Sequence, residues 1–256
     1  MNKIVITGAA GFIGSHVYDF FRKKFPNTEI VIFDKMTYAA DIRNISSVVQ
    51  SKKNSLVIGD LIDFSKCLKV TKNSDLVINL AAESHVDNSF GNSLIFTKTN
   101  TLGTHTLIEA CKINKVKKII HVSTDEVYGE NTSDIFKEES PLLPTNPYSA
   151  AKAGAEMIVR SYYKSFNLPI IVVRANNIFG TRQYPEKIIP KFILRSIKKL
   201  PLKLHGDGSN LRHYLSTSDF SRALGLLARD GVFGEVYNIA SDIELTNYEM
   251  ANLIVS

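Results

Sequence analysis

The sequence predicts an α/β fold: a doubly wound parallel sheet with a smaller lobe towards the C-terminus. Short apolar runs rich in Val, Ile and Leu alternate with longer amphipathic stretches, which is typical of repeated strand–helix units. The apolar runs are continuous and do not alternate with polar residues, as expected when helices cover both faces of a sheet. A glycine-rich turn follows the first run, where such sheets bind phosphates.

Strands are expected wherever a short apolar run lies between polar or turn residues. The first run ends at a turn that starts with Gly8, and the second ends at Asp34. The same criterion predicts strands over 3–8, 29–34, 55–59, 75–81, 118–124 and 168–174, with a later one over 235–239. Apolar residues at helical spacing predict helices over 12–25, 93–114 and 147–166.

The pattern changes after residue 175. Residues 187–200 indicate a basic amphipathic helix, and 201–216 indicate two extended pieces on either side of a turn at Gly206-Asp207-Gly208. A further helix is expected over 218–229, with Ser218 or Thr217 as its N-cap.

We therefore expect an NAD-binding Rossmann domain over 1–175, completed by a strand from 235–240, and a partial lobe over 176–256. A last helix is expected from Asn247, which would cap it. The sequence stops at Ser256, before that helix reaches a usual length, which favours a truncated chain.

Length and composition indicate an ordinary soluble protein. The 256 residues suffice for one large domain or for one domain with a small second lobe. Cys67 and Cys111 are too few for a disulfide framework, which indicates core thiols in a reducing compartment. No apolar run reaches the ~18–20 residues that cross a membrane. No leader is visible before the first strand, so we expect a cytoplasmic protein with no membrane partner.

The chain carries 31 basic and 25 acidic residues, a net charge of +6. The basic residues are scattered in pairs such as Lys52-Lys53 and Lys117-Lys118. Solvated surface charge explains this pattern better than a nucleic-acid-binding stripe does. A modest positive field also favours a small phosphorylated substrate.

The glycine-rich turn has the spacing Gly8-x-x-Gly11-x-x-Gly14 between a strand and a helix. Gly8 permits the tight turn, Gly11 lets the backbone approach a pyrophosphate, and Gly14 allows close packing of helix and strand. The helix N-terminus offers unpaired N–H groups to the phosphates. An ordinary glycine-rich turn is the alternative, and the strand before it and the helix after it disfavour that alternative.

Asp34 ends the second strand, twenty residues after Gly14. A carboxylate there accepts hydrogen bonds from a ribose diol and repels a 2′-phosphate, so the sequence favours NAD over NADP. Asp60 is a weaker candidate for the adenine side and is equally compatible with a turn residue.

A hydroxyl, two carboxylates, a phenol and an ammonium occur close together in the sequence. Thr124, Asp125 and Glu126 follow an apolar strand, and Tyr148 and Lys152 lie one helical turn apart just after a proline. Because a strand end and a helix start can converge at the carboxyl edge of a parallel sheet, we expect one reactive cluster there.

A phenol that acts as a base near pH 7 needs its pKa lowered by about 3 units, or ~4 kcal/mol. A lysine ammonium ~5 Å away supplies roughly 3 kcal/mol at an effective dielectric constant of ~20. The positive ring of an oxidised nicotinamide would add to this. The pair Tyr148 and Lys152 is therefore able to take a proton from a sugar hydroxyl.

These motifs resemble those of the extended short-chain dehydrogenases/reductases that act on nucleotide sugars. The shared residues are the glycine-rich turn, Asn79-Leu80-Ala81-Ala82, 123–129 and Tyr148-x-x-x-Lys152. Within that family, segments 81–87, 124–126, 174–177 and 184–191 are similar to the NDP-glucose 4,6-dehydratases. The resemblance extends from Lys3 to Ile254.

The resemblance implies a three-step reaction with no net oxidation or reduction. Tyr148, with Thr124 and Lys152, would deprotonate the C4 hydroxyl while hydride passes from C4 to NAD. Glu126 would then remove the C5 proton, and Asp125 would protonate the departing C6 hydroxyl. Return of the hydride to C6 would give a 4-keto-6-deoxy sugar.

The same matching implies two sets of binding residues and no metal site. The NAD site would comprise Gly8, Gly11, Phe12, Ile13, Gly14, Asp34, Lys35, Thr37, Asp60, Leu61, Ala81, Ala82, Thr99, Tyr148, Lys152 and Asn177. The nucleotide sugar would meet Ser84, His85, Thr124, Asn176, Lys187, Leu202, Arg212 and Asn238.

Several of these residues keep alternative interpretations. Arg212 is the candidate for the diphosphate, because its planar fork suits phosphate oxygens, but a surface hairpin arginine is the alternative. His85 is equally compatible with a structural histidine, and His205 is expected at the rim of the pocket.

The family also implies a homodimer, for which the helices over 93–114 and 147–166 are candidates, although their apolar residues are equally expected to face the sheet. The family's chains continue beyond the position of Ser256, so the nucleotide-base pocket is expected to be incomplete.

Two other functions are weighed against a dehydratase. A UDP-glucuronate decarboxylase or an NDP-sugar 4-epimerase is the alternative within the family, but those relatives resemble Thr-Ser-Glu or Ser-Ser-x here and lack the acid at Asp125. A catalytically silent NAD-binding scaffold is the alternative from another class, and the intact reactive cluster disfavours it. The choice between dTDP-glucose and UDP-glucose stays open, although 205–210 resembles the UDP-glucose branch.

Overall fold

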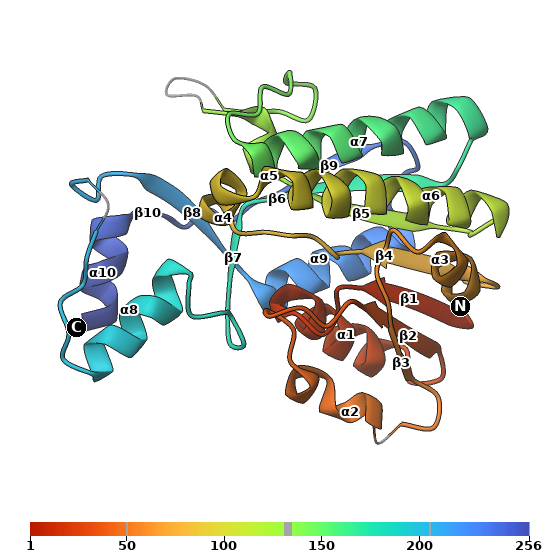
Figure 1. Cartoon of the computed structure of the whole chain (residues 1–256), viewed down its shortest axis with the longest axis horizontal. Coiled ribbons are helices and arrows are strands. Elements are labelled where there is room, and N and C mark those ends of the chain that lie inside the picture. Colours follow the sequence, from red (N-terminus) through yellow and green to blue (C-terminus); the bar gives the residue numbers. More distant parts are fainter. Residues whose placement is uncertain (50, 131–134, 205, 256) are drawn as a thin grey trace.

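A seven-stranded parallel sheet forms the centre of the computed structural model, which describes residues 1–49, 51–130, 135–204 and 206–255 (Figure 1). The strand order is β3-β2-β1-β4-β5-β6-β9. The strands are β1 Lys3–Thr7, β2 Glu29–Asp34, β3 Ser55–Ile58, β4 Leu76–Asn79, β5 Ile119–Thr124, β6 Ile170–Ala175 and β9 Val236–Ile239. The chain order reverses between β1 and β4, the point at which open sheets of this kind leave a crevice for ligands.

The predicted doubly wound sheet is confirmed, and each of its strands lies within two residues of the predicted run. In the central strands nearly every side chain is buried, because helices cover both faces. No helix among the residues that the structure describes is long and apolar enough to cross a membrane.

Helices cover the two faces of the sheet in separate layers (Figure 1). α1 and α9 pack against one another on one face, and α3, α6 and α7 lie on the other. The helical elements of this domain are α1 Phe12–Lys24, η1 Ile42–Ile45, α2 Ser46–Val49, α3 Phe64–Thr71, α4 Val86–Gly91, α5 Ser93–Phe96, η2 Thr97–Gly103, α6 Thr104–Ile113, η3 Asp125–Tyr128, α7 Pro147–Phe166 and α9 Thr217–Asp230.

The smaller lobe contains a second, three-stranded sheet of order β10-β8-β7, together with α8 and α10 (Figure 1). Its elements are β7 Asn177–Phe179, α8 Ile188–Ile197, β8 Leu211–Ser216, β10 Glu244–Thr246 and α10 Asn247–Val255. Short strands β7 and β10 were not predicted. Only the second of the two extended pieces expected over 201–216 is a strand, because the residues before the turn make no sheet pairs among those described.

Two predicted helix caps are wrong. Ser216, rather than Thr217 or Ser218, caps α9, since its hydroxyl accepts the N–H of Asp219. Thr246, rather than Asn247, caps α10. Its hydroxyl accepts the N–H of Glu249 at 3.0 Å while the Glu249 carboxylate accepts the N–H of Thr246 at 2.7 Å.

The helix expected over 93–114 is divided by a π-helical turn, η2. This wider turn carries Thr99 and Asn100 towards the loop that follows β4. Asn100 is buried. Its side chain accepts the Glu83 N–H and donates to the Glu83 carbonyl oxygen, each at 2.9 Å. Interruptions of this type occur often at functional sites.

A buried polar cluster joins the ends of β1, β4 and β5. Asn79 accepts a hydrogen bond from Thr7 at 2.7 Å and donates to Thr104 and to Nδ1 of His121, each at 3.2 Å. Nε2 of His121 has no hydrogen-bond partner within the described ranges. Burial, together with the charge of Lys152, lowers the pKa of His121 well below 6.5, so this imidazole is neutral.

The His121→Gln substitution is expected to weaken the acid sensitivity of the fold. In the unfolded chain His121 binds a proton as the pH falls through about 6.5, whereas the buried ring in the folded protein stays neutral. The free energy of unfolding therefore falls as the pH drops. Between pH 7.5 and 5.5 the unsubstituted protein should lose about 1.4 kcal/mol more than the variant, measured by urea unfolding. The control is His16→Gln, because the His16 ring is only half-buried and is hydrogen-bonded to the Thr181 carbonyl. Equal losses in the His121 variant and the unsubstituted protein would contradict this account.

Candidate active site

Two adjoining cavities open at the carboxyl edge of the central sheet. The larger, of about 420 Å³, lies between the sheet edge and the smaller lobe, and the smaller, of about 190 Å³, lies over the glycine-rich turn. The residues that line both are Phe12, Ile13, Leu80, Ala82, Ser84, Gln183, Glu186 and Lys187. The two cavities therefore share a wall, which suits two ligands that react with one another.

The glycine-rich turn leaves no room for side chains. Gly8 has a φ of +70°, and a Cβ atom on it would lie 2.8 Å from the backbone of Ala81. A Cβ on Gly14 would lie 2.3 Å from the Gly8 carbonyl oxygen, so this glycine packs the helix against the turn rather than against the strand. α1 begins at Phe12, with Gly11 at the N-cap, no side-chain cap and no acidic residue in its first turn. Such a helix start accepts a phosphate group.

Asp34 is held at the end of β2 by two backbone hydrogen bonds. Its Oδ2 accepts the N–H of Ala10 at 2.9 Å, and its Oδ1 accepts the N–H of Met36 at 2.8 Å. Burial raises the pKa of Asp34, and both hydrogen bonds oppose that shift. Each oxygen keeps a lone pair for a ribose hydroxyl in the smaller cavity. The glycine turn and this carboxylate together fit a dinucleotide with an unmodified ribose.

The Asp34→Asn substitution is expected to raise the Kd for NAD at least tenfold. The substitution removes charge-assisted hydrogen bonds worth ~1.5–3 kcal/mol. It also replaces one of the two acceptor oxygens with an NH2 group, so one backbone N–H loses its partner. It should also narrow the preference for NAD over NADP. Titration calorimetry with each cofactor checks this, with Glu29→Gln at the exposed start of the same strand as control. An unchanged preference would show that Asp34 does not read the ribose.

The remaining predicted cofactor residues divide between the two cavities. The smaller is lined by Gly8, Gly11, Gly14, Lys35, Thr37, Asp60, Leu61, Ala81 and Thr99, in addition to residues already named. Tyr148, Lys152 and Asn177 line the larger. Lys35 and Asp60 form an ion pair of 2.7 Å at the smaller cavity.

The reactive cluster predicted from sequence lies together in the larger cavity. Thr124 ends β5, Asp125 and Glu126 begin the η3 turn, and Tyr148 and Lys152 lie on the first two turns of α7. α7 is placed by a capping box in which the Asn146 side chain accepts the Ser149 N–H at 2.9 Å and the Ser149 hydroxyl accepts the Asn146 N–H at 3.2 Å.

The two carboxylates have different neighbours. Asp125 accepts hydrogen bonds from Asn176 at 2.8 Å and from the Thr124 hydroxyl at 3.2 Å. Glu126 accepts a longer hydrogen bond from Asn146, at 3.3 Å. Burial raises the pKa of both groups, and Asp125 raises that of Glu126 further. Raised carboxyl pKa values in a cleft are typical of groups that exchange protons near neutral pH.

The expected effect of Lys152 on Tyr148 is not seen. Burial and the nearby charges of Glu126 and Asp125 raise the pKa of Tyr148, and only the Thr124 hydrogen bond lowers it. Lys152 donates instead to the Val122 carbonyl oxygen at 2.6 Å. Burial lowers the pKa of Lys152 to about 8, with Glu156 opposing that shift. Burial therefore favours the uncharged form of both side chains.

The predicted sugar-nucleotide residues are only partly brought together. Ser84, Thr124, Asn176, Lys187 and Arg212 line the larger cavity. His85, Leu202 and Asn238 line neither cavity among the described residues. Nδ1 of His85 accepts the Asn88 N–H at 3.4 Å, and Nε2 lies 3.9 Å from Glu186. Asn238 is hydrogen-bonded to Tyr128 at 2.6 Å. His205 lies outside the described residues.

Sequence reasoning missed two asparagines that shape the site. Asn146 caps α7 and touches Glu126, and the pair Asn146-Pro147 before a helical pattern is a signal that could have found it. Asn100 holds the loop after β4, and no local pattern marks it because its partner is Glu83. Lys191 and Lys203 also line the larger cavity and were not predicted.

Comparisons with known proteins agree with this geometry. The family model described as GDP-mannose 4,6 dehydratase matches residues 5–256. The dTDP-D-glucose 4,6-dehydratase of Dictyostelium discoideum is 47% identical over all of this chain, which spans 62% of that protein. A trifunctional UDP-glucose 4,6-dehydratase of Arabidopsis thaliana is 49% identical over 94% of this chain, which spans 37% of its length.

A solved structure extends the comparison. The dTDP-glucose 4,6-dehydratase from Streptomyces venezuelae, with NAD bound, superposes with a TM-score of 0.95 and 36% identity. The alignment covers 99% of this chain and 80% of that one.

Proposed function

The chain belongs to the GDP-mannose 4,6 dehydratase family, and on that premise we propose that its protein is an NAD-dependent 4,6-dehydratase of a nucleotide-activated glucose. The observation that carries the proposal is the pair Asp125 and Glu126, held in different hydrogen-bonding environments beside Tyr148 and Lys152 in one cavity. An oxidation at C4 needs only the tyrosine and the lysine. The carboxylate pair supplies the acid and the base that a subsequent loss of water requires.

NAD would be held by the glycine-rich turn, by Asp34 and by the other residues of the smaller cavity. When bound, it supplies reversible acceptance of hydride from a sugar carbon. Three of the predicted cofactor residues line both cavities: Phe12, Ile13 and Ala82. They connect the smaller cavity to the larger one.

The proton transfers are proposed as follows. Tyr148, as the phenolate, takes the proton of the C4 hydroxyl, with Thr124 hydrogen-bonded to its oxygen and Lys152 one helical turn away. Glu126 removes the proton from C5, which the new C4 ketone has made acidic. Asp125, whose pKa burial raises and whose carboxyl group Asn176 positions, gives a proton to the C6 hydroxyl as it leaves. General acids and bases of this kind each contribute ~10²–10⁴ to the rate.

The charge of the larger cavity suits a nucleoside diphosphate. Lys187, Lys191, Lys203 and Arg212 line it, and Arg212 offers a planar fork to phosphate oxygens. Relatives named for dTDP-glucose and for UDP-glucose are about equally similar to this chain, at 47% and 49% identity. We therefore propose a nucleotide-activated glucose as the substrate. The experiment below distinguishes dTDP-glucose from UDP-glucose.

Asp125 separates this proposal from a decarboxylase or an epimerase. Neither of those reactions expels a hydroxyl from C6, so neither needs a protonated acid beside the base. Burial raises the pKa of Asp125, and Asn176 holds its carboxyl group in place, which supports a dehydratase rather than these alternatives.

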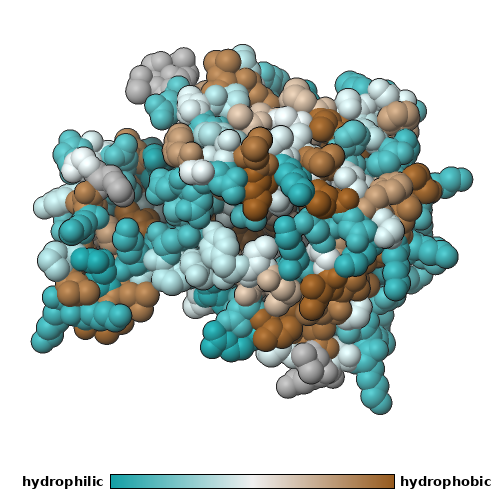
Figure 2. Space-filling model, in the orientation of Figure 1, coloured by the Kyte–Doolittle hydropathy of each residue, from teal (hydrophilic) through white to brown (hydrophobic). Residues whose placement is uncertain are grey.

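A homodimer is part of the proposal. Exposed apolar side chains lie on α5, η2 and α7, among them Leu94, Leu102 and Met157, which are 80%, 50% and 46% exposed. Figure 2 shows apolar surface over this helical layer. Sedimentation equilibrium should give a dimer that Leu102→Glu dissociates, whereas Leu226→Glu on α9 should leave it intact. A monomeric unsubstituted protein would refute the dimer.

A reducing, cytoplasmic setting is also proposed. Cys67 and Cys111 are both free and buried. Burial raises the pKa of the Cys67 thiol to about 12, so this thiol stays protonated and unreactive.

The proposed activity is tested by incubating the full-length protein with dTDP-glucose or UDP-glucose and no added cofactor. Mass spectrometry should show a product lighter by one water from at least one of them. The Tyr148→Phe variant is the inactive control. If neither sugar gives such a product, even with NAD supplied, the proposed function is wrong.

A further inference from the structure

A buried ion pair lies behind the reactive cluster, and neither of its groups transfers a proton in the chemistry proposed above. Arg174 on β6 and Glu156 on α7 are both fully buried, and Nε of Arg174 donates to Oε2 of Glu156 at 3.1 Å. A second hydrogen bond joins the Arg174 Nη2 to Oε1 of the same carboxylate. A buried pair of this kind gives little net stability, because removing both charges from water costs nearly as much as their attraction returns. Its placement therefore calls for another explanation.

The other end of the Arg174 guanidinium reaches the η3 turn. Nη1 donates to the Tyr128 hydroxyl at 2.6 Å and to the Glu138 carbonyl oxygen at 3.0 Å. The guanidinium carbon also lies 4.7 Å from the centre of the Tyr128 ring. Tyr128 is the last residue of η3 and is buried. One side chain thus connects α7 to the turn that begins with Asp125 and Glu126.

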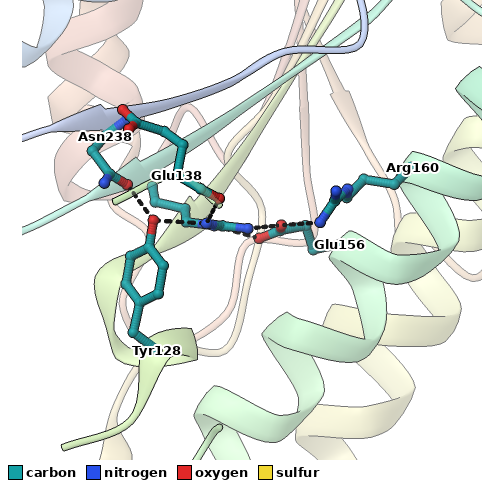
Figure 3. A network of polar contacts seen from close by, with 6 residues as sticks. Tyr128, Glu138, Glu156, Arg160 and Asn238 are labelled. Carbon is teal, nitrogen blue, oxygen red and sulfur yellow. Dashed lines mark hydrogen bonds and ion pairs between the residues drawn. The ribbon is translucent and has the colours of Figure 1, made fainter. Parts of the chain in front are cut away.

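Tyr128 is fixed on its remaining sides as well (Figure 3). Its hydroxyl donates to the Asn238 side chain at 2.6 Å, and its ring stacks on Phe136 with centres 4.8 Å apart. The Asn238 N–H in turn donates to the Glu138 carboxylate at 2.9 Å. Figure 3 shows Tyr128, Glu138, Glu156 and Asn238 in one network of polar contacts. The Tyr128 hydroxyl therefore connects the C-terminal end of η3 to Arg174 on β6 and to Asn238 on β9.

The two halves of the reactive cluster have different anchors. Tyr148, Lys152 and Glu156 follow at intervals of four on α7, so they share one face of that helix. α7 has anchors of its own, including the Asn146 capping box and the hydrogen bond from Thr101 to the Ala151 carbonyl at 2.8 Å. η3 is a single short turn, and Tyr128 holds its far end.

We propose that Arg174 is a positioning residue that acts through Tyr128 to hold the Asp125–Glu126 turn against α7. This assignment rests on the proposed function. It means that the contacts of Tyr128 support the loss of water more than the oxidation at C4. Neither Arg174 nor Tyr128 lines either cavity among the described residues, so neither is assigned contact with a ligand.

The test uses Tyr128→Phe in the full-length protein, because it keeps the ring and removes only the hydroxyl. Single-turnover rates of nicotinamide reduction and of water loss are measured separately. Water loss should slow roughly tenfold while the oxidation rate stays within about twofold. Arg160→Lys is the matched control, since Arg160 lies 3.9 Å from the same Glu156 carboxylate but on its exposed side. It should change neither rate. Equal slowing of both steps by Tyr128→Phe, or no slowing of water loss, would overturn the proposal.

A second readout does not need activity. Hydrogen exchange of the Gly129 amide, which is bonded to the Glu126 carbonyl at 3.2 Å, should be about fivefold faster or more in Tyr128→Phe and unchanged in Arg160→Lys. If the unsubstituted protein forms no dehydrated product but the exchange difference is present, the proposed function fails and the positioning role stands. Unchanged exchange refutes the positioning role whatever the activity.

Arg174→Lys completes the series. Lysine keeps the charge but cannot span Glu156 and Tyr128 together, so the same selective slowing is expected. A thermal unfolding curve shows whether it folds. If it does not fold, Tyr128→Phe alone decides the question.

Discussion

Replacing Asp125 with Asn slows the loss of water by about 10³-fold while the oxidation at C4 keeps most of its rate. This is the expected result because an amide has no proton to give to a departing hydroxyl. The amide still fits beside Asn176, which donates to the Asp125 carboxylate at 2.8 Å. The reduced nicotinamide should therefore form normally and then persist, which its absorbance in a single turnover would record.

The matched control is Asp242→Asn, which removes an exposed carboxylate from the smaller lobe. It should leave both steps unchanged. If Asp125→Asn slows the oxidation as much as the loss of water, then Asp125 supports the whole site and is not the acid of the second step.

Replacing Tyr148 with Phe should reduce the oxidation at C4 by at least 10³-fold, and with it every later step. The phenol lines the larger cavity and is hydrogen-bonded to Thr124, which places it to accept the hydroxyl proton. Burial raises the pKa of Tyr148 in the protein without cofactor, so the phenol must lose its proton before it can accept another. The positive charges of Lys152 and of oxidised nicotinamide favour that loss, and we expect the oxidation rate to rise with pH as the phenolate forms.

Tyr18→Phe controls for the loss of a buried tyrosine hydroxyl. Tyr18 is fully buried in the core on the other side of the sheet, where its hydroxyl is bonded to Asn54 at 3.1 Å. It should lower stability without changing the oxidation rate. Retention of more than about a tenth of that rate in Tyr148→Phe would reject the assigned proton acceptor.

The fold was predictable because its central strands are buried on both faces and therefore read as uninterrupted apolar runs. The glycine-rich turn and Asp34 were predictable for a related reason, since close backbone approach and a ribose diol admit few residue types. The family resemblance predicted from these motifs is confirmed by the family match over residues 5–256. The assignment of individual site residues stays a prediction.

Features that depend on distant partners could not be predicted. Arg174 lies in the strand predicted over 168–174, yet its charge is neutralised by Glu156 on a helix eighteen residues earlier. The π-turn η2 follows no local pattern, because Asn100 is drawn inward by the backbone of Glu83. Burial raises the pKa of Tyr148, a contribution that the sequence argument from the charges of Lys152 and the cofactor did not include.

The central claim, that hydride leaves C4 and returns to C6 within one active site, is tested most directly with substrate carrying deuterium at C4. The account predicts a product lighter by one water that retains the deuterium, now at C6, with no net change in the cofactor. Loss of the deuterium to solvent, or its accumulation on the nicotinamide, would contradict the account.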